Sequence, residues 1–268
     1  MQKTILITGA TDGIGFETAK MLVKQGHHVL LHGRNSNKLA EVERNLALLS
    51  NSVQTESYIA DLSSIKEVNA LADMLKHKHQ HIDVLINNAG VYSADNHRSS
   101  DNLDIRFAVN TIAPYILTNA LLPIMNKQSR VLNLSSAAQS TVNLNAMAGK
   151  EVLSDGEAYA QSKLALTIFS RVLGMQLKMS GPAIIAINPK SLLASKMVKN
   201  AFGIVGNDLS LGAEVLCQAS LCDEFTHASG LYFDNDKEKF ADPHPDALDP
   251  AICESVMKAI TETIARVG

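Results

Sequence analysis

Apolar runs of strand length alternate with amphipathic segments of helix length along the whole chain. The short runs are rich in β-branched residues, whereas the longer segments space their apolar residues for one buried helix face. The predicted strands are 4–8, 28–33, 53–59, 82–87, 130–135, 183–188 and 230–233. The predicted helices are 14–25, 37–49, 64–78, 101–125 with a break near Asn110, 157–179, 209–221 and a last one that runs from Asp249 and Pro250 toward Arg266.

This alternation predicts a parallel sheet covered by helices on both faces, because neighbouring parallel strands need a long crossover connection. No repeat, low-complexity tract or linker divides residues 1–268, so we expect a single α/β domain. Two less regular segments, 137–157 and 190–208, follow predicted strand ends. Ligands bind at the carboxyl ends of the strands in such sheets, so these segments are predicted to form the walls of a binding site.

Composition and charge exclude several classes of protein. A content of 46% hydrophobic and 19% charged residues is typical of a folded globular chain. The net charge of −3 offers no basic surface to nucleic acid or acidic lipid. The three cysteines have no metal-like spacing, and we find no signal peptide and no apolar run of about 18 residues. We therefore expect a cytoplasmic protein without a membrane anchor and without a nucleic-acid partner.

Three histidines stand two positions apart, at His77, His79 and His81, and resemble a metal-binding tract. Residues two positions apart do not share a face of a helix. The histidines also lie near the end of a predicted helix, where a basic residue interacts favourably with the helix dipole. No metal site is predicted.

Three glycines stand at the turn between the first predicted strand and the first predicted helix. The run GATDGIG occupies residues 9–15, and Gly26 is placed to end the helix. Glycines at such a turn let backbone amides approach a pyrophosphate at the positive end of the helix. The spacing is GxxxGxG rather than GxGxxG, and an ordinary tight turn is the alternative. The strand before and the helix after it favour a nucleotide site.

Tyr159 and Lys163 stand four residues apart at the start of a long amphipathic segment, 23 residues after the second serine of the pair Ser135-Ser136. On a helix this spacing places the phenol and the ammonium on one face. A tyrosine, whose pKa is ordinarily about 10, becomes a usable general acid/base when a neighbouring cation favours the phenolate. One such pair can arise by chance, so its weight depends on the rest of the chain.

Further polar motifs follow the other predicted strands. Asp61-Leu62 follows the third strand, NNAG (87–90) the fourth, and Asn188-Pro189 closes the sixth. With TGATDGIG (8–15), Asn110, Ser136 and YAQSK (159–163), the chain resembles the short-chain dehydrogenase/reductase family along essentially all of its length. The text around RNSNKLAEV and DVLINNAGVY is most similar to the retinol-dehydrogenase-like and carbonyl-reductase branches.

The resemblance implies a doubly wound Rossmann fold, with a seven-stranded and mainly parallel sheet in strand order 3-2-1-4-5-6-7. It implies that Tyr159 exchanges a proton with the substrate oxygen, and that Lys163 lowers the pKa of Tyr159 and binds the nicotinamide ribose. Ser136 would hydrogen-bond the substrate oxygen, and Asn110 would hold a water in a proton relay. The implied cofactor-binding residues are Gly9, Thr11, Asp12, Gly13, Ile14, Gly15, Arg34, Asp61, Leu62, Asn88, Ala89, Gly90, Tyr159, Lys163, Pro189 and Leu192.

The cofactor type is indicated by the end of the second predicted strand. A site for NAD(H) normally has an acidic residue there, which binds the ribose 2′-hydroxyl. Gly33 and Arg34 stand there instead, and they favour NADP(H), whose 2′-phosphate needs room and positive charge. Asp12 in the glycine turn is an exception to the pattern of many NADP-binding relatives, which have a basic residue near it.

Two features depart from the family pattern. Segment 137–157 holds an insertion of some ten residues between the serine and the tyrosine, judged by the usual spacing in the family. Lys190 stands where relatives usually have glycine after the sixth strand. Lys190 either marks a decayed site, points its stem outward, or adds charge beside the substrate.

An apolar segment that follows is either a lid over a lipophilic substrate or a helix packed on the body; it comprises Leu192, Leu193, Ala194, Met197, Val198, Ala201, Phe202, Ile204 and Val205.

Two functions of different classes fit these residues. The first is an NADP(H)-dependent oxidoreductase that interconverts a ketone or aldehyde and the alcohol. The second is a catalytically silent NADP-binding protein that signals redox state. The complete set of Asn110, Ser136, Tyr159 and Lys163 favours the enzyme, because a sensor has no need of all four. Helices 101–125 and 157–179 often pair between subunits in this family, so a homo-oligomer is expected.

Overall fold

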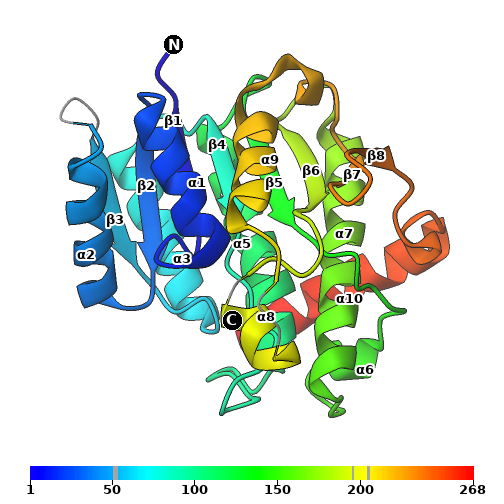
Figure 1. Ribbon diagram of the computed structural model, residues 1–268. Coiled ribbons are helices and arrows are strands. Elements are labelled where there is room, and N and C mark those ends of the chain that lie inside the picture. The colour runs from blue at the N-terminus through cyan, green and yellow to red at the C-terminus, as the bar shows by residue number, and fades with distance from the viewer. Residues whose placement is uncertain (51–53, 195, 204–205) are drawn as a thin grey trace.

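Eight strands form one sheet in the part of the chain that the structure describes. The structure is a computed structural model, and it describes residues 1–50, 54–194, 196–203 and 206–268. The strand order is β3-β2-β1-β4-β5-β6-β7-β8 (Figure 1). The first seven strands are parallel and β8 runs antiparallel to β7. The strands are β1 (Thr4–Ile7), β2 (His28–Gly33), β3 (Thr55–Ile59), β4 (Val84–Asn87), β5 (Arg130–Leu134), β6 (Ala183–Asn188), β7 (Tyr232–Asp234) and β8 (Lys239–Ala241).

The predicted fold class and strand order are confirmed, and the strand count is eight rather than seven. Strand β8 was not predicted, because it spans only Lys239–Ala241 and has too few residues for an alternating pattern. Its pairing with β7 depends on a tight hairpin in which Glu238 has a φ of 54°. Residue 53, the first of the predicted third strand, lies outside the described residues.

Helices cover both faces of the sheet, as the alternating pattern predicts. The helices and helical turns are α1 (Gly13–Lys24), α2 (Ser36–Ala47), α3 (Ile65–Lys78), α4 (Ile105–Phe107), η1 (Ala108–Ile112), α5 (Ala113–Leu121), η2 (Leu122–Ile124), α6 (Leu144–Met147), α7 (Asp155–Leu177), α8 (Lys196–Phe202), α9 (Leu209–Leu221), η3 (Asp223–Phe225), η4 (Pro245–Ala247) and α10 (Pro250–Val267). The predicted break near Asn110 is the π-helical turn η1, which separates α4 from α5.

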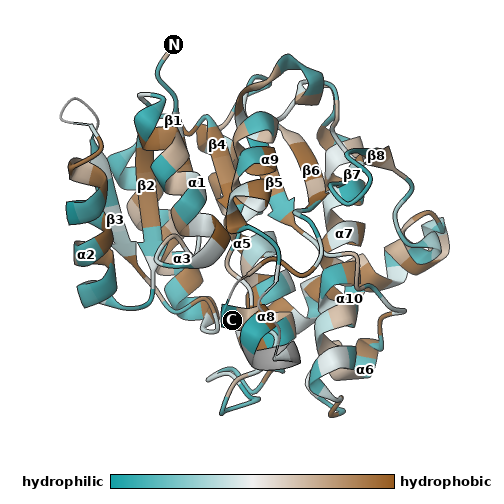
Figure 2. Ribbon diagram, viewed as in Figure 1, coloured by the Kyte–Doolittle hydropathy of each residue, from teal (hydrophilic) through white to brown (hydrophobic). Residues whose placement is uncertain are grey.

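The alternation of side chains along the strands divides the core into two layers. Ile5 and Ile7 of β1 pack with α1, α2 and α9, whereas Leu6 between them packs with α3, α5 and α7. Both faces of the strand are therefore apolar, which is why the inner strands read as continuous apolar runs. In Figure 2 the central strands β1, β2 and β4 are hydrophobic, while the outer helix α2 is largely hydrophilic.

Helix α10 packs against α7 and α6 and contributes Val256 and Ile260 to the core layer on that side. Near its end, the Arg266 guanidinium donates to the carbonyl of Ala148 in the inserted segment, at 2.6 Å. The C-terminal helix therefore fastens the insertion to the domain.

Homo-oligomer formation through α5 and α7 stays a prediction, and light scattering at micromolar concentration measures it.

The longest apolar helical stretch lies inside the domain. Within the described ranges, Ile105–Ile124 is long and apolar enough to cross a membrane by length and composition, so the expectation that the chain has no such run is wrong. Of its most apolar window, 67% is buried against the rest of the protein. This burial is typical of a core helix, since α5 is covered by α3 on one side and by α7 on the other.

Candidate active site

The glycine turn after β1 has the conformation that its sequence predicts. Gly9 and Gly13 have φ values of 67° and 56°, a region that favours glycine. A Cβ on Gly9 would lie 2.9 Å from the Cα of Ala89, so the turn passes too close to the segment after β4 for any side chain. Asp12 caps α1 by accepting a hydrogen bond from the Gly13 amide at 2.9 Å. The N-terminus of α1 therefore faces the carboxyl edge of the sheet, where an anion is favoured.

His32, which the sequence analysis missed, holds this turn from β2. Its Nδ1 accepts from the Gly9 amide at 3.3 Å, and its Nε2 donates to the carbonyl of Ala60 at 3.1 Å. Only the neutral ring can form both bonds, because a protonated Nδ1 cannot accept from the Gly9 amide. Burial lowers the pKa of His32 from 6.5 to about 4 and so keeps it neutral. The signal in the sequence was a histidine inside an otherwise apolar strand.

Asn88 and Thr8 join the same turn to β4. The Asn88 side-chain amide donates to the carbonyls of Thr8 and Gly9, at 2.8 and 3.1 Å. The Thr8 hydroxyl accepts from the amides of Asn88 and Ala89, both at 3.0 Å. A Cβ on Gly15 would lie 2.4 Å from the Asn88 side-chain nitrogen. Gly15 therefore allows α1 to approach the sheet and does not line a cavity.

A cavity of about 440 Å³ lies along this edge of the sheet, between the glycine turn and α7. It brings together most of the predicted cofactor residues: Gly9, Thr11, Asp12, Gly13, Ile14, Arg34, Asp61, Leu62, Asn88, Ala89, Gly90, Pro189, Tyr159 and Lys163. Gly15 and Leu192 do not line it, and neither do Ser136 and Asn110. Lys38 and His32 line it and were not predicted.

The residues of the cavity fit a nicotinamide dinucleotide. Backbone amides of the glycine turn and the start of α1 lie at one wall, with Arg34 and Lys38 nearby. Among the described residues no group of three or more His, Cys, Asp or Glu is arranged to hold a metal ion. Backbone amides and cationic side chains are suited to phosphate oxygens.

Lys163 and Tyr159 lie at the other end of the cavity, one helical turn apart on α7. The Lys163 ammonium donates to the carbonyl of Leu134 at the end of β5, at 2.6 Å, and lies 5.6 Å from the centre of the Tyr159 ring. Burial lowers the pKa of Lys163 to about 8. Burial also raises the pKa of Tyr159, and a hydrogen bond with Ser136 acts against this rise. The net direction for Tyr159 is opposite to the lowering that the sequence analysis expected from Lys163.

The two serines after β5 point to opposite sides, as strand alternation predicts. The Ser135 hydroxyl is buried and shares a 2.6 Å hydrogen bond with the Thr167 hydroxyl. The Ser136 side chain hydrogen-bonds Tyr159, and its oxygen also accepts from the Ala138 amide at 3.1 Å. Ser136 is therefore the serine that meets the tyrosine.

The Asn110 side chain is engaged at both ends. Its oxygen accepts from the Val91 amide at 2.8 Å, and its nitrogen donates to the carbonyl of Val91 and the hydroxyl of Ser162, both at 2.9 Å. The side chain thus ties the segment after β4 to α7.

Lys190 has a backbone conformation that favours glycine, with a φ of 117°. Its ammonium lies 3.8 Å from a carboxylate oxygen of Glu238, in the β7–β8 hairpin. The stem therefore points away from the cavity, which is one of the alternatives that the sequence left open. The same hairpin holds the turn through two hydrogen bonds. The Asn235 side-chain amide donates to the carbonyl of Pro189 at 2.9 Å, and the Asp236 carboxylate accepts from the backbone amide of Ser191 at 3.0 Å.

The described part of the apolar segment after this turn is partly packed on the body of the protein and partly exposed or next to the cavity. Leu193 is buried, whereas Leu192 is 46% exposed, and Met197 of α8 lines the cavity. Lys196 forms an ion pair with Asp12 and so connects α8 to the glycine turn. Ile204 and Val205 lie outside the described residues, as do the side chains of Ala201 and Phe202. The segment therefore borders the cavity through Lys196 and Met197 of α8 and not through Leu192, which precedes the helix.

A family model described as "short chain dehydrogenase" matches residues 3–203. The chain belongs to the short-chain dehydrogenase family, a family of oxidoreductases. Human retinol dehydrogenase 13 is 29% identical over 93% of this chain and 81% of its own length. Bovine retinol dehydrogenase 12 is 30% identical over 90% and 80%, and human polyprenol dehydrogenase 29% over 88% and 78%. The retinol-dehydrogenase-like branch that the motifs indicated is confirmed.

Solved structures are similar over most of the chain. A putative uncharacterized protein from Mycobacterium paratuberculosis has a TM-score of 0.81 and 25% identity, over 98% of this chain and 94% of that one. A putative short chain dehydrogenase from Escherichia coli CFT073, solved in complex with NADPH, has a TM-score of 0.71 and 25% identity, over 87% and 96%. The family assignment and these neighbours support a nicotinamide cofactor.

The low pKa of His32 makes stability depend on pH. Below pH 6.5 the unfolded chain takes up a proton at this histidine, and the folded protein does not until about pH 4. Stability therefore falls as the pH drops through this window, by on the order of 2 kcal/mol between pH 7 and pH 5 for His32 alone. Urea unfolding at both pH values should show a smaller fall for His32→Asn, whose oxygen can accept from the Gly9 amide without titrating. Equal falls in both proteins would contradict this role.

Lys190→Gly should stabilise the protein, because it removes a Cβ from a backbone conformation that costs roughly 1 kcal/mol or more. The matched control is Lys190→Ala, which loses the ion pair with Glu238 but keeps the Cβ. We expect the glycine variant to gain about 1 kcal/mol in the free energy of unfolding, and the alanine variant to change by less than ~0.5 kcal/mol. Urea titration measures both, and a glycine variant no more stable than the alanine variant would argue against backbone strain.

Proposed function

We propose that this protein is an NADP(H)-dependent oxidoreductase that interconverts a ketone or aldehyde and the corresponding alcohol. The observation that carries the proposal is that Tyr159 and Lys163 line the cavity, with Ser136 as the partner of Tyr159, and that the same cavity is lined by a glycine turn suited to pyrophosphate. An acid/base tyrosine beside a dinucleotide site is the arrangement that hydride chemistry on a carbonyl requires.

The bound nicotinamide would supply the hydride for reduction, or accept it for oxidation. Ser136 holds the substrate oxygen by a hydrogen bond where negative charge develops, and Tyr159 gives that oxygen its proton. Lys163 presents an ammonium at the cavity wall beside Tyr159, where it can bind ribose hydroxyls. Asn110 keeps the segment after β4 in place through both of its bonds to Val91.

Tyr159 is in the protonated form that carbonyl reduction needs. The pKa of Tyr159 is raised by burial, so the phenol carries its proton at neutral pH and is ready to donate it. The pKa of Lys163 is about 8, so a modest change of environment switches its charge near neutral pH. A protonated tyrosine is the form needed when an alkoxide develops on the substrate.

The charges of the cavity support NADP(H) over NAD(H). Arg34 lines it directly after β2, where an NAD site would have an acidic residue, and Lys38 lines it from the first turn of α2. Asp12 is the one acidic side chain of the glycine turn, and its ion pair with Lys196 offsets its charge. Burial would raise the pKa of Asp12, but the bonds to Lys196 and Gly13 lower it overall. Similar structures that hold NADP or NADPH agree with this preference.

A lipophilic substrate is the class we favour. Val91, Val109 and Met197 are apolar members of the cavity wall, and Tyr92 packs on Tyr159 with ring centres 5.1 Å apart. The relatives named retinol and polyprenol dehydrogenases carry lipophilic alcohols in their names. A screen of aliphatic and aromatic ketones and aldehydes, followed by NADPH absorbance, tests the class. Binding of NADPH without turnover of any carbonyl would instead favour the silent redox sensor.

Tyr159→Phe should lower kcat by roughly 10²- to 10⁴-fold, because it removes the proton donor while keeping the ring. Binding of NADPH, measured by fluorescence titration, should stay close to that of the wild type. Tyr115→Phe is the matched control, because Tyr115 packs on Phe169 and does not line the cavity. A Tyr159→Phe enzyme with near wild-type kcat would contradict the assignment.

Arg34→Ala and Lys38→Ala should each weaken NADPH binding about 10-fold or more while changing NADH binding little, because a lost charge-assisted bond to phosphate costs about 1.5 kcal/mol or more. Arg44→Ala is the control, since Arg44 is exposed in the last turn of the same helix α2. The measurement is the dissociation constant of each variant for NADPH and for NADH. Equal weakening of NADPH and NADH would mean that these cations do not meet the 2′-phosphate.

A further inference from the structure

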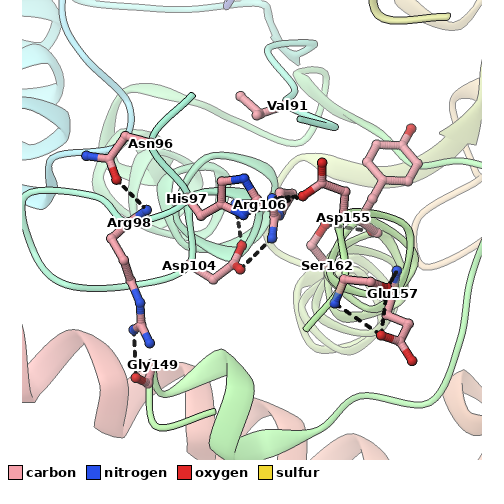
Figure 3. A network of polar contacts seen from close by, with 12 residues as sticks. Val91, Asn96, His97, Arg98, Asp104, Arg106, Gly149, Asp155, Glu157 and Ser162 are labelled. Atoms are coloured by element: carbon pink, nitrogen blue, oxygen red, sulfur yellow. Dashed lines mark hydrogen bonds and ion pairs between the residues drawn. The ribbon is translucent and has the colours of Figure 1, made fainter. Parts of the chain in front are cut away.

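Arg106 is a fully buried arginine with two carboxylate partners. Its side chain is 0% exposed, and its guanidinium donates to Asp104 at 2.8 Å and to Asp155 at 2.7 Å (Figure 3). Asp104 also caps α4 by accepting from the Arg106 amide at 2.9 Å. A buried charge is costly unless it is paired in good geometry. The two carboxylates therefore fix the place of this side chain closely.

Asp155 is the first residue of α7 and stands one turn before Tyr159. Residues four apart lie on the same helix face, so Asp155, Tyr159 and Lys163 form one stripe along α7. A displacement of Asp155 therefore moves the helix face that carries Tyr159 and Lys163.

The same short segment also holds α7 one turn further along. Asn110 donates to the Ser162 hydroxyl at 2.9 Å, and Thr111 donates to the Ser162 carbonyl at 2.8 Å. Tyr159 therefore lies between two anchor points on α7, and both are contacted from residues 106–111. The Ser162 anchor uses a family motif residue, whereas the Asp155 anchor was not predicted from any motif.

Arg106 also sits where two surface segments meet. The segment before α4 is held by Arg98, which donates to the carbonyls of Asn102 and Gly149 at 2.9 and 2.7 Å. Gly149 belongs to the insertion before α7, and His97 lies 3.5 Å from the Asp155 carboxylate. The segment after β4, the insertion and the start of α7 are thus joined by two arginines, and the rings of Tyr92 and Tyr159 make a further contact between the segment after β4 and α7.

We propose that Arg106 is a positioning residue for Tyr159, which it holds against Ser136 by anchoring the first turn of α7 through Asp155. The proposal rests on the acid/base role of Tyr159 in the proposed function. When the anchor is lost, the first turn of α7 loosens and the hydrogen bond between Tyr159 and Ser136 weakens. Lys163 is unaffected at first, because its own bond to Leu134 lies two turns from Asp155.

Asp155→Ala is the variant that tests the anchor, because it leaves Arg106 paired with Asp104. We expect kcat for carbonyl reduction to fall roughly 10- to 100-fold, as small misplacements of catalytic groups do, while KM for NADPH changes less than about twofold. The Ser136 bond holds the pKa of Tyr159 down, so the basic limb of the kcat profile should move to higher pH. Asp155→Asn, whose oxygen can still accept from Arg106, should recover most of the activity.

Glu157→Ala is the matched control. Glu157 forms the capping box of the same helix turn with Ser154 and makes no contact with Arg106, so its loss weakens the helix end alone. We expect a lower thermal midpoint for Glu157→Ala with a near wild-type kcat and pH profile. If Glu157→Ala and Asp155→Ala lose kcat equally, or Asp155→Ala keeps its kcat and pH profile, Arg106 has only a structural role and the proposal is wrong.

Arg106→Lys keeps the charge but can satisfy only part of the two-carboxylate site, and should fall between the wild type and Asp155→Ala. Amide hydrogen exchange of residues 159–163 is measured on every variant. Faster exchange in Asp155→Ala than in Glu157→Ala is expected, and equal exchange would overturn the anchor. If the wild type reduces no carbonyl, the proposed function fails, and hydrogen exchange still decides whether Arg106 anchors the turn.

Discussion

The buried ammonium of Lys163 is the interaction on which the geometry of the site depends. A lysine that is only 4% exposed must find hydrogen-bond acceptors inside the protein, and the carbonyl of Leu134 at the end of β5 supplies one at 2.6 Å. That bond ties α7 to the end of β5 at the residue that borders the cavity. Tyr159 stands one turn away on α7, beside Ser136, the second residue after β5.

The opposite end of the cavity depends on close backbone approach rather than on charge. Gly9 and Gly15 leave no room for a side chain between β1, α1 and the segment after β4, and Asn88 and His32 complete the hydrogen bonds of the turn. The positive side chains of Arg34, Lys38 and Lys196 line the cavity. Asp12 is the single acidic residue of the glycine turn, and it is paired with Lys196. Rigid backbone and surplus positive charge together suit a phosphorylated dinucleotide.

The hairpin of β7 and β8 shows how the protein tolerates a departure from its family. Lys190 occupies a turn with a backbone conformation that favours glycine, and the strain is held by bonds from Asn235 and Asp236. Its ammonium faces Glu238 of the same hairpin instead of the cavity. The short edge strand that the sequence pattern did not reveal thus supports the turn beside the candidate nicotinamide site.

The sequence by itself determined three features: the order of the apolar strands, the glycine turn, and the spacing of Tyr159 and Lys163. Each is a local pattern that side-chain periodicity or backbone freedom sets. The interruption at Asn110 was also foreseen, and it is a π-helical turn. The contacts of His32, Arg106 and Asp236 were decided only in three dimensions. Each joins segments far apart in the chain, and burial, which sets the direction of the pKa of Tyr159, exists only after those segments pack.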